Sequence, residues 1–119
     1  MTLPPPTGAN NSRSARGAVE EYFFAWNTGH YELLDGLLSD GWVDHSHPDR
    51  RSAADVHRAF QSARETQPDT QVLIDAVLGD GDLITVNGRI VTGDRVNRRV
   101  WIVKTEGTRL REIWTHMVD

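Results

Sequence analysis

Two segments in the first third of the chain carry hydrophobic residues at helical spacing. Between Ser14 and Asn27 the apolar positions recur every three or four residues, which predicts a helix with Tyr22 on its buried face. Gly29 follows as a residue that accepts the left-handed backbone conformation common just beyond a helix. The leucine-rich segment Tyr31–Leu38 predicts a second, shorter helix.

A third helix is predicted to begin with a capping box. The side chain of Ser52 can accept a hydrogen bond from the amide of Asp55, whose carboxylate can reach back toward the helix start. Val56 and Phe60 belong to the apolar stripe of this helix, and Pro68 blocks its continuation.

The other hydrophobic segments have the composition of strands. They are a brief strand at Trp42–His45 and four longer ones at Thr70–Leu78, Asp82–Thr92, Val96–Thr105 and Thr108–Val118. Turns that contain glycine separate the four longer strands, which favours successive antiparallel hairpins. Three helices followed by an antiparallel meander predict an α+β domain with its helices on one face of the sheet. Such an arrangement can leave a ligand cavity between the sheet and the helices.

Length, composition and charge restrict the class of protein. The 119 residues suffice for one domain. We expect a disordered tail at residues 1–13 and a single domain at 14–119. A net charge of −4 argues against a nucleic-acid partner, and the lack of cysteine excludes disulfides and thiolate metal sites. No apolar run is long enough for a membrane span, so we expect a cytoplasmic protein without a membrane partner.

Five short motifs stand out along the chain: Trp26-Asn-Thr-Gly, Val43-Asp-His45, Pro68-Asp, Gly81-Asp and Arg111-Glu-Ile-Trp114. Together they resemble motifs of the SnoaL-like family in the nuclear transport factor 2-like superfamily. The superfamily includes polyketide cyclases, ketosteroid isomerases and limonene epoxide hydrolases. The resemblance implies a cone-shaped, curved antiparallel sheet of about four to five strands packed against three N-terminal helices. It also implies a deep pocket and a homodimer formed through the sheet face, where Trp114 and His116 are expected to point.

The resemblance also suggests which residues perform chemistry. The histidine and aspartate positions of the SnoaL-type cyclases fall on Trp101 and Thr115, and neither side chain is an acid or base at neutral pH. The ketosteroid isomerase positions match better, because Tyr22 and Trp101 fall where oxyanion donors are expected and His45 falls near the catalytic aspartate.

The residue types allow a proton-transfer site. The imidazole of His45 can accept a proton near neutral pH, and the phenol of Tyr22 can donate a hydrogen bond to an enolate oxygen. Trp101 can donate through its indole nitrogen or stack on a flat ligand. Each of the three also has a plain structural interpretation, as a loop cap, a core tyrosine and a packing residue. Candidate substrate-binding residues are Trp26, Asn87, Ile113, Thr115 and Met117.

We therefore predict a small-molecule enzyme that transfers a proton on an apolar carbonyl compound, as an isomerase or cyclase does. Polyketide or steroid-like rings are the expected substrates, and this chemistry needs no cofactor. The alternative is a non-catalytic ligand-binding or dimerisation protein of the same fold. His45, His47 and Asp49 lie close in sequence, but two histidines without a third ligand of clear spacing are a weak signal for a metal site, and no metal is predicted.

Overall fold

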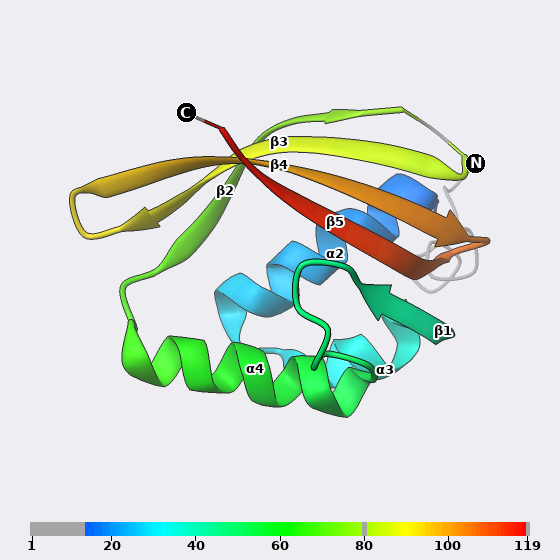
Figure 1. The fold of residues 1–119 in the computed structure, drawn as a ribbon, viewed down its shortest axis with the longest axis horizontal. Coiled ribbons are helices and arrows are strands. Elements are labelled where there is room, and N and C mark those ends of the chain that lie inside the picture. Colours follow the sequence, from blue (N-terminus) through cyan, green and yellow to red (C-terminus); the bar gives the residue numbers. More distant parts are fainter. Residues whose placement is uncertain (1–13, 80, 119) are drawn as a thin grey trace, which may run out of the picture.

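The computed structural model describes residues 14–79 and 81–118, so the tail predicted at 1–13 lies outside the described residues. The described elements are α2 (Ala15–Thr28), the 3-10 turn η1 (Tyr31–Leu33), α3 (Leu34–Leu37), β1 (Leu38–Asp44), α4 (Ala53–Thr66), β2 (Gln71–Leu78), β3 (Leu83–Thr92), β4 (Arg95–Glu106) and β5 (Arg109–Val118). The helices lie on one side of the sheet (Figure 1), which confirms the predicted α+β class.

Local sequence signals place the ends of the two long helices. Ser14 caps α2 by accepting from the amide of Gly17 at 2.9 Å, and Gly29 ends the helix with φ +78°. Ser52 caps α4 by accepting from the amide of Asp55 at 3.2 Å. Both caps satisfy amides that have no partner within the first turn of a helix.

The sheet has the strand order β1-β5-β4-β3-β2. The four strands β2 to β5 form the predicted antiparallel meander, but β1 pairs in parallel with β5, which makes the sheet mixed. The predicted second helix is also shorter than expected, because the backbone turns extended at Leu38 and this residue pairs with Leu110 on β5. Strand pairing therefore overrides the helical leucine spacing at the end of that segment.

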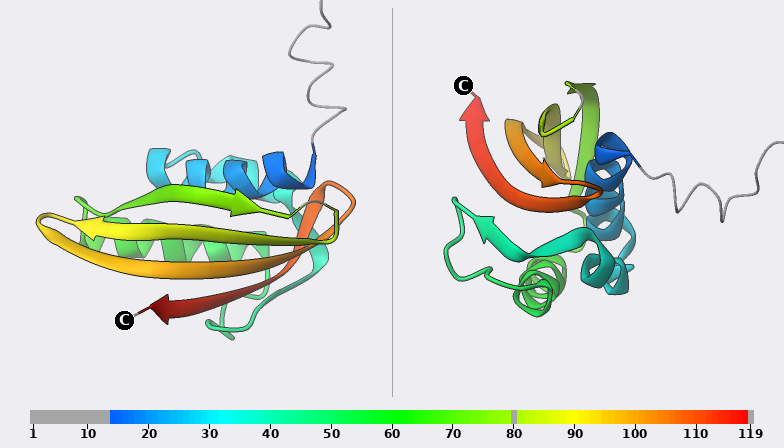
Figure 2. Two further views of the ribbon diagram at one scale, coloured as in Figure 1. Left: turned by 90° about the horizontal axis from the view of Figure 1, so that it is seen from above. Right: turned by 90° about the vertical axis from the view of Figure 1, so that its right-hand side faces the viewer.

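The sheet curves around the helices (Figure 2), and the pairing of β2 with β3 contains a bulge. The register shifts between Ile74 and Ala76, opposite Gly88. A Cβ atom at Gly88 would lie 2.5 Å from the Leu73 carbonyl oxygen and 3.0 Å from the Trp101 ring. Glycine therefore permits the close approach of the two strands at the point where the sheet bends.

An asparagine side chain attaches α2 to the neighbouring strand β2. The Asn27 amide nitrogen donates to the Val72 carbonyl oxygen at 2.7 Å, and its side-chain oxygen accepts from the Val72 amide at 2.8 Å. Asn27 thus satisfies the backbone of Val72 as a neighbouring strand would, and it fixes the end of α2 against the sheet.

Candidate functional site

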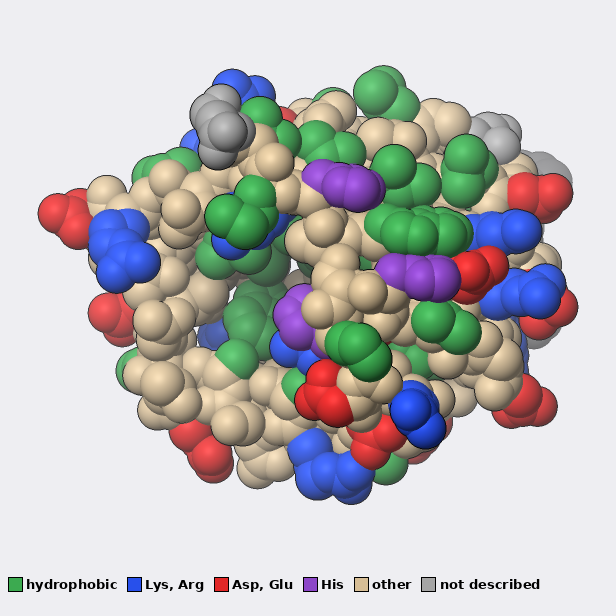
Figure 3. Space-filling view, viewed as in Figure 1, with side chains coloured by type: hydrophobic (Ala, Val, Ile, Leu, Met, Phe, Trp, Pro, Cys, Tyr) green, Lys and Arg blue, Asp and Glu red, His purple; other side chains and the backbone are tan. Residues whose placement is uncertain are grey.

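A cavity of about 230 Å³ lies between the inner face of the sheet and the helices. Most of its wall is apolar and comes from Phe23, Trp26, Phe60, Val72, Ile90, Trp101 and Ile113. Its polar lining comes from Tyr22, Asp44, His47, Arg50, Arg99 and Thr115. Figure 3 shows the hollow above α4, with hydrophobic side chains inside it and histidine and basic side chains at its edge. An apolar cavity with a few polar groups is typical of a small-molecule site.

Tyr22 contributes a phenol to this cavity from a tightly packed position on α2. Its ring centroid lies 5.3 Å from that of Phe23, 5.4 Å from that of Phe60 and 5.9 Å from that of Trp42. Burial raises the pKa of Tyr22 well above its usual value, and the negative charge of Asp44 raises it further. The side chain therefore remains a neutral hydrogen-bond donor across the physiological pH range.

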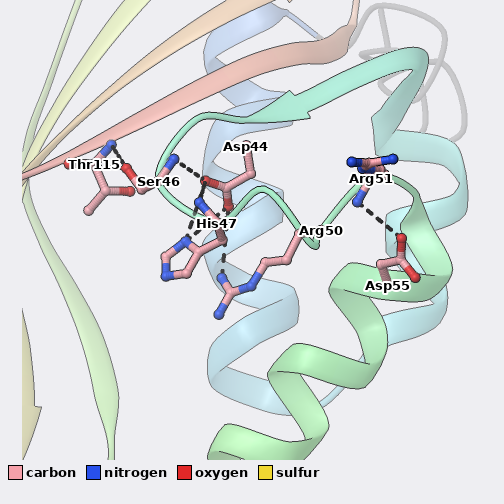
Figure 4. A network of polar contacts seen from close by, with 7 residues as sticks. All are labelled: Asp44, Ser46, His47, Arg50, Arg51, Asp55 and Thr115. Carbon is pink, nitrogen blue, oxygen red and sulfur yellow. Dashed lines mark hydrogen bonds and ion pairs between the residues drawn. The ribbon is translucent and has the colours of Figure 1, made fainter.

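A buried carboxylate organises the loop that follows β1. Asp44 is only 3% exposed, and its Oδ1 accepts from the amides of Ser46 at 3.0 Å and His47 at 3.1 Å. Nδ1 of His47 lies 3.4 Å from the same carboxylate, and Nη1 of Arg50 lies 3.8 Å from its Oδ2. Figure 4 shows the imidazole with its other nitrogen directed away from Asp44. The carboxylate can therefore orient His47 while leaving Nε2 available to a ligand.

The loop is also attached to the last strand of the sheet. The Ser46 hydroxyl accepts from the Thr115 amide at 3.1 Å and donates to the Thr115 carbonyl at 3.3 Å. These contacts, drawn in Figure 4, hold the loop beside the inner face of β5. The polar cluster of Asp44, His47 and Arg50 is therefore fixed relative to the apolar wall.

The model of the SnoaL-like domain matches residues 19–115. The chain belongs to the SnoaL-like family. No curated protein matches this SnoaL-like chain significantly.

Solved structures show the same fold at low sequence identity. A SnoaL-like polyketide cyclase from Agrobacterium tumefaciens is 10% identical with a TM-score of 0.74, covering 90% of this chain and 93% of its own. A candidate polyketide cyclase from Bacillus cereus is 20% identical with a TM-score of 0.75, covering 87% and 73%. A candidate ketosteroid isomerase from Kribbella flavida is 20% identical with a TM-score of 0.74, covering 88% and 78%. In the described part of this SnoaL-like chain, no helix combines the length and apolar character needed to cross a membrane.

The cavity of this SnoaL-like protein is lined by five of the eight site residues that the sequence suggested. Tyr22, Trp26, Trp101, Ile113 and Thr115 all line it, from α2, β4 and β5. Trp101 is 5% exposed and packs edge-to-face on Phe23, with ring centroids 4.8 Å apart. The indole nitrogen of Trp26 is buried without a hydrogen-bond partner, and its ring stands edge-on to Phe60. Trp26 is therefore a packed part of the wall.

The structure does not bring His45 together with Tyr22 and Trp101. Its ring stacks on Trp114, with centroids 4.5 Å apart and planes 4° apart, and its Nε2 donates to Glu112 at 2.8 Å. Side chains two residues apart on a strand point to the same side. His45 therefore shares the outer face with Val43, while Asp44 shares the inner side with Trp42. The base expected in the cavity therefore cannot be His45 in this conformation.

Two proposed substrate-binding residues also lie outside the cavity. On β3 the buried Val86 and the cavity-lining Ile90 point to the inner side. Asn87 is adjacent to Val86, so its side chain points to the outer face. Met117 lies two residues after Thr115 on β5, so its side chain points to the same side of the sheet. It is nevertheless 74% exposed and does not line the cavity.

Sequence reasoning missed four polar residues of the cavity: Asp44, His47, Arg50 and Arg99. Two of them could have been placed on the inner face by strand alternation, because Asp44 lies two residues after the buried Trp42 and Arg99 lies two residues before Trp101. No comparable pattern marks His47 and Arg50, because they lie in a loop whose path depends on the Asp44 hydrogen bonds.

Proposed function

We propose that this SnoaL-like protein is an enzyme that transfers a proton beside the carbonyl group of a largely apolar compound, as an isomerase or cyclase does. The observation that supports it most is the pairing of His47 with the buried Asp44 in a cavity that also holds the Tyr22 phenol. A base and a neutral hydrogen-bond donor in one apolar cavity are the two groups that enolisation requires.

In the proposed reaction Nε2 of His47 removes a proton from the carbon next to the carbonyl. The electron pair of the broken C–H bond moves into the carbonyl, and the oxygen becomes an enolate that accepts a hydrogen bond from Tyr22. An isomerase returns the proton from His47 to a different carbon, whereas in a cyclase the enolate carbon attacks a second carbonyl. The chemistry uses no cofactor.

Asp44 is proposed as a positioning residue. Its contact with His47 is 3.4 Å, longer than an ordinary hydrogen bond, and such contacts often tighten only when substrate binds. The negative charge of Asp44 stabilises the imidazolium that forms after proton abstraction. It also selects the tautomer in which Nδ1 carries the hydrogen and Nε2 is free to accept a proton.

The cavity dimensions favour a small substrate. Its volume of about 230 Å³ lies below the roughly 300–1,000 Å³ of sites for drug-sized ligands. A compound with one or two rings therefore fits the proposal better than a four-ring steroid. Trp101 supplies a flat apolar surface for such a ring.

The proposal can be tested by measuring exchange of the α-protons of small cyclic ketones in D₂O by proton NMR. We expect the wild-type protein to accelerate exchange, and His47→Gln to lower the rate by about 100-fold or more. His45→Gln is the matched control, because this histidine lies outside the cavity, and it should leave the rate unchanged. The proposal fails if no ketone in the series exchanges faster than in buffer, or if His45→Gln is the variant that loses activity.

A second variant separates positioning by Asp44 from its role in the loop. Asp44→Asn retains an oxygen that can accept the amides of Ser46 and His47 but removes the charge that faces the imidazole. We expect a lower kcat with little change in KM and in melting temperature. A variant that unfolds, or that alters KM alone, would contradict the positioning role.

The alternative function is ligand binding without catalysis. It is supported by the apolar Trp101 and the neutral Thr115, which occupy the positions that the cyclase resemblance gives to an acid-base pair. Saturable ketone binding with no α-proton exchange in any of the compounds would favour this alternative. A homodimer through the outer sheet face, where Trp114 stacks on His45, remains a separate proposal.

A further inference from the structure

Arg99 stands out among the cavity residues because no acidic side chain within residues 14–79 and 81–118 pairs with it. It lies two residues before Trp101 on β4, on the same inner face, and it lines the cavity. Its guanidinium donates one hydrogen bond, from Nη1 to the Arg98 carbonyl oxygen at 3.1 Å. Most of the five N–H donors of this group are therefore available to a ligand.

The second arginine of the cavity is already committed. Arg50 is held by Asp44, 3.8 Å from its Oδ2, and its guanidinium carbon lies 6.0 Å from the centre of the Phe60 ring. The cavity lining thus contains one carboxylate, which contacts Arg50, and two guanidinium groups, so the positive charge of Arg99 has no acidic partner among the described residues. The chain as a whole is acidic, with a net charge of −4. The excess of positive charge in the cavity lining therefore differs from the overall charge of the protein.

We propose that Arg99 binds a carboxylate on the substrate, so that the ligand is an apolar keto acid. This inference rests on the proposed function for the chemistry at the other end of the molecule. A guanidinium group suits a carboxylate because it can donate two parallel hydrogen bonds to its two oxygens. The remaining lining near Arg99, which includes Ile90 and Trp101, matches an apolar body.

The fold separates this group from the proposed base. Arg99 lies on β4, whereas His47 follows β1, and β5 lies between these two strands. Two strand spacings correspond to roughly 10 Å. The carboxylate of the ligand is therefore expected several bonds away from the carbon that loses its proton, where its charge does not oppose enolate formation.

A binding experiment tests this inference without turnover. The ligands are 3-phenylpropionate and its neutral amide, 3-phenylpropanamide, together with the pairs one methylene shorter and longer. Intrinsic tryptophan fluorescence at neutral pH reports binding, since Trp26 and Trp101 line the cavity. We expect the wild-type protein to bind the best carboxylate about tenfold more tightly than its amide. Arg99→Gln should remove this preference, and Arg99→Lys should retain part of it.

Arg98→Gln is the matched control, because it removes the same charge from the adjacent, exposed residue of β4 on the outer face. It should keep the preference for the carboxylate. The inference is overturned if no carboxylate binds at low millimolar concentration, if the wild-type protein does not distinguish acid from amide, or if Arg99→Gln still distinguishes them.

The outcome is separable from that of the proposed function. His47→Gln should retain the carboxylate preference, because the base does not contact the carboxylate. Arg99-dependent binding without any α-proton exchange would refute proton transfer and leave the ligand class standing. Exchange of neutral ketones that is unaffected by Arg99→Gln, with no preference for acids, would refute the ligand class alone.

Discussion

The bend of the sheet at Gly88 gives a prediction that links the fold to the cavity. In Gly88→Ala the added methyl group would lie 2.5 Å from the Leu73 carbonyl oxygen and 3.0 Å from Trp101. The carbonyl belongs to the backbone of β2, so this strand must move away, and the contact with Trp101 requires a further small shift of its ring. Overpacking of this kind destabilises a protein by about 1–3 kcal/mol. The lower entropy of the unfolded alanine chain offsets about 0.5 kcal/mol of this effect.

We therefore expect Gly88→Ala to lower the free energy of unfolding by about 1.5 kcal/mol. For a chain of 119 residues each kcal/mol changes the melting temperature by about 4 °C, so the expected decrease is about 6 °C. Thermal unfolding followed by circular dichroism measures the shift, and the near-ultraviolet spectrum reports displacement of the tryptophan.

Gly36→Ala is the matched control for this experiment. No atom lies within 4 Å of a Cβ built at Gly36, which occupies the exposed side of α3. The same substitution there should raise stability by about 0.5 kcal/mol, because alanine favours the helical backbone. A Gly88→Ala protein as stable as the wild type would show that the close approach of β2 and β3 is not needed for the bend.

Three further predictions concern single contacts. Asn27→Ala removes both hydrogen bonds to the backbone of Val72 and should destabilise the protein by about 2–3 kcal/mol in urea unfolding. Tyr22→Phe should remain folded. Because it lacks the hydroxyl that donates to the enolate oxygen, its rate in the α-proton exchange assay should be about 100-fold lower. The hydrogen bond from His45 lowers the pKa of Glu112 below its ordinary value of 4.5, so the folded state gains stability from the ionised carboxylate. This contribution is lost as the pH falls through the lowered pKa, and the melting temperature of Glu112→Gln should therefore decrease less than that of the wild type on acidification below about 4.5.

The sequence predicted the elements whose signals are local. Ser14 and Gly29 place the ends of α2, and the four long strands of the meander were located to within about one residue of their observed ends. The pairing of β1 was not predictable in the same way. It depends on contact between Leu38 and Leu110, which are far apart in the chain, and helical spacing of the leucines pointed to a different local structure.

The candidate site was predicted best where it lies on regular elements. Tyr22 on α2 and Trp101 on β4 have their directions set by helical and strand periodicity, and both line the cavity. The assignment of His45 relied on the resemblance to related sites, and it did not use the alternation of β1. Because Trp42 is buried, alternation alone places Asp44 on the inner side and His45 on the outer face.

Asp44 explains why the polar part of the site was hardest to infer. Its Oδ1 accepts the amides of Ser46 and His47, as an aspartate does in many surface turns, and this local role accounts for an aspartate at that position without reference to function. Yet the carboxylate is buried and faces the His47 imidazole and the Arg50 guanidinium in the cavity. The hydrogen bonds that shape the turn thus also place the imidazole. A substitution that preserves the turn and removes only the charge, as Asp44→Asn does, is the change that separates these two roles.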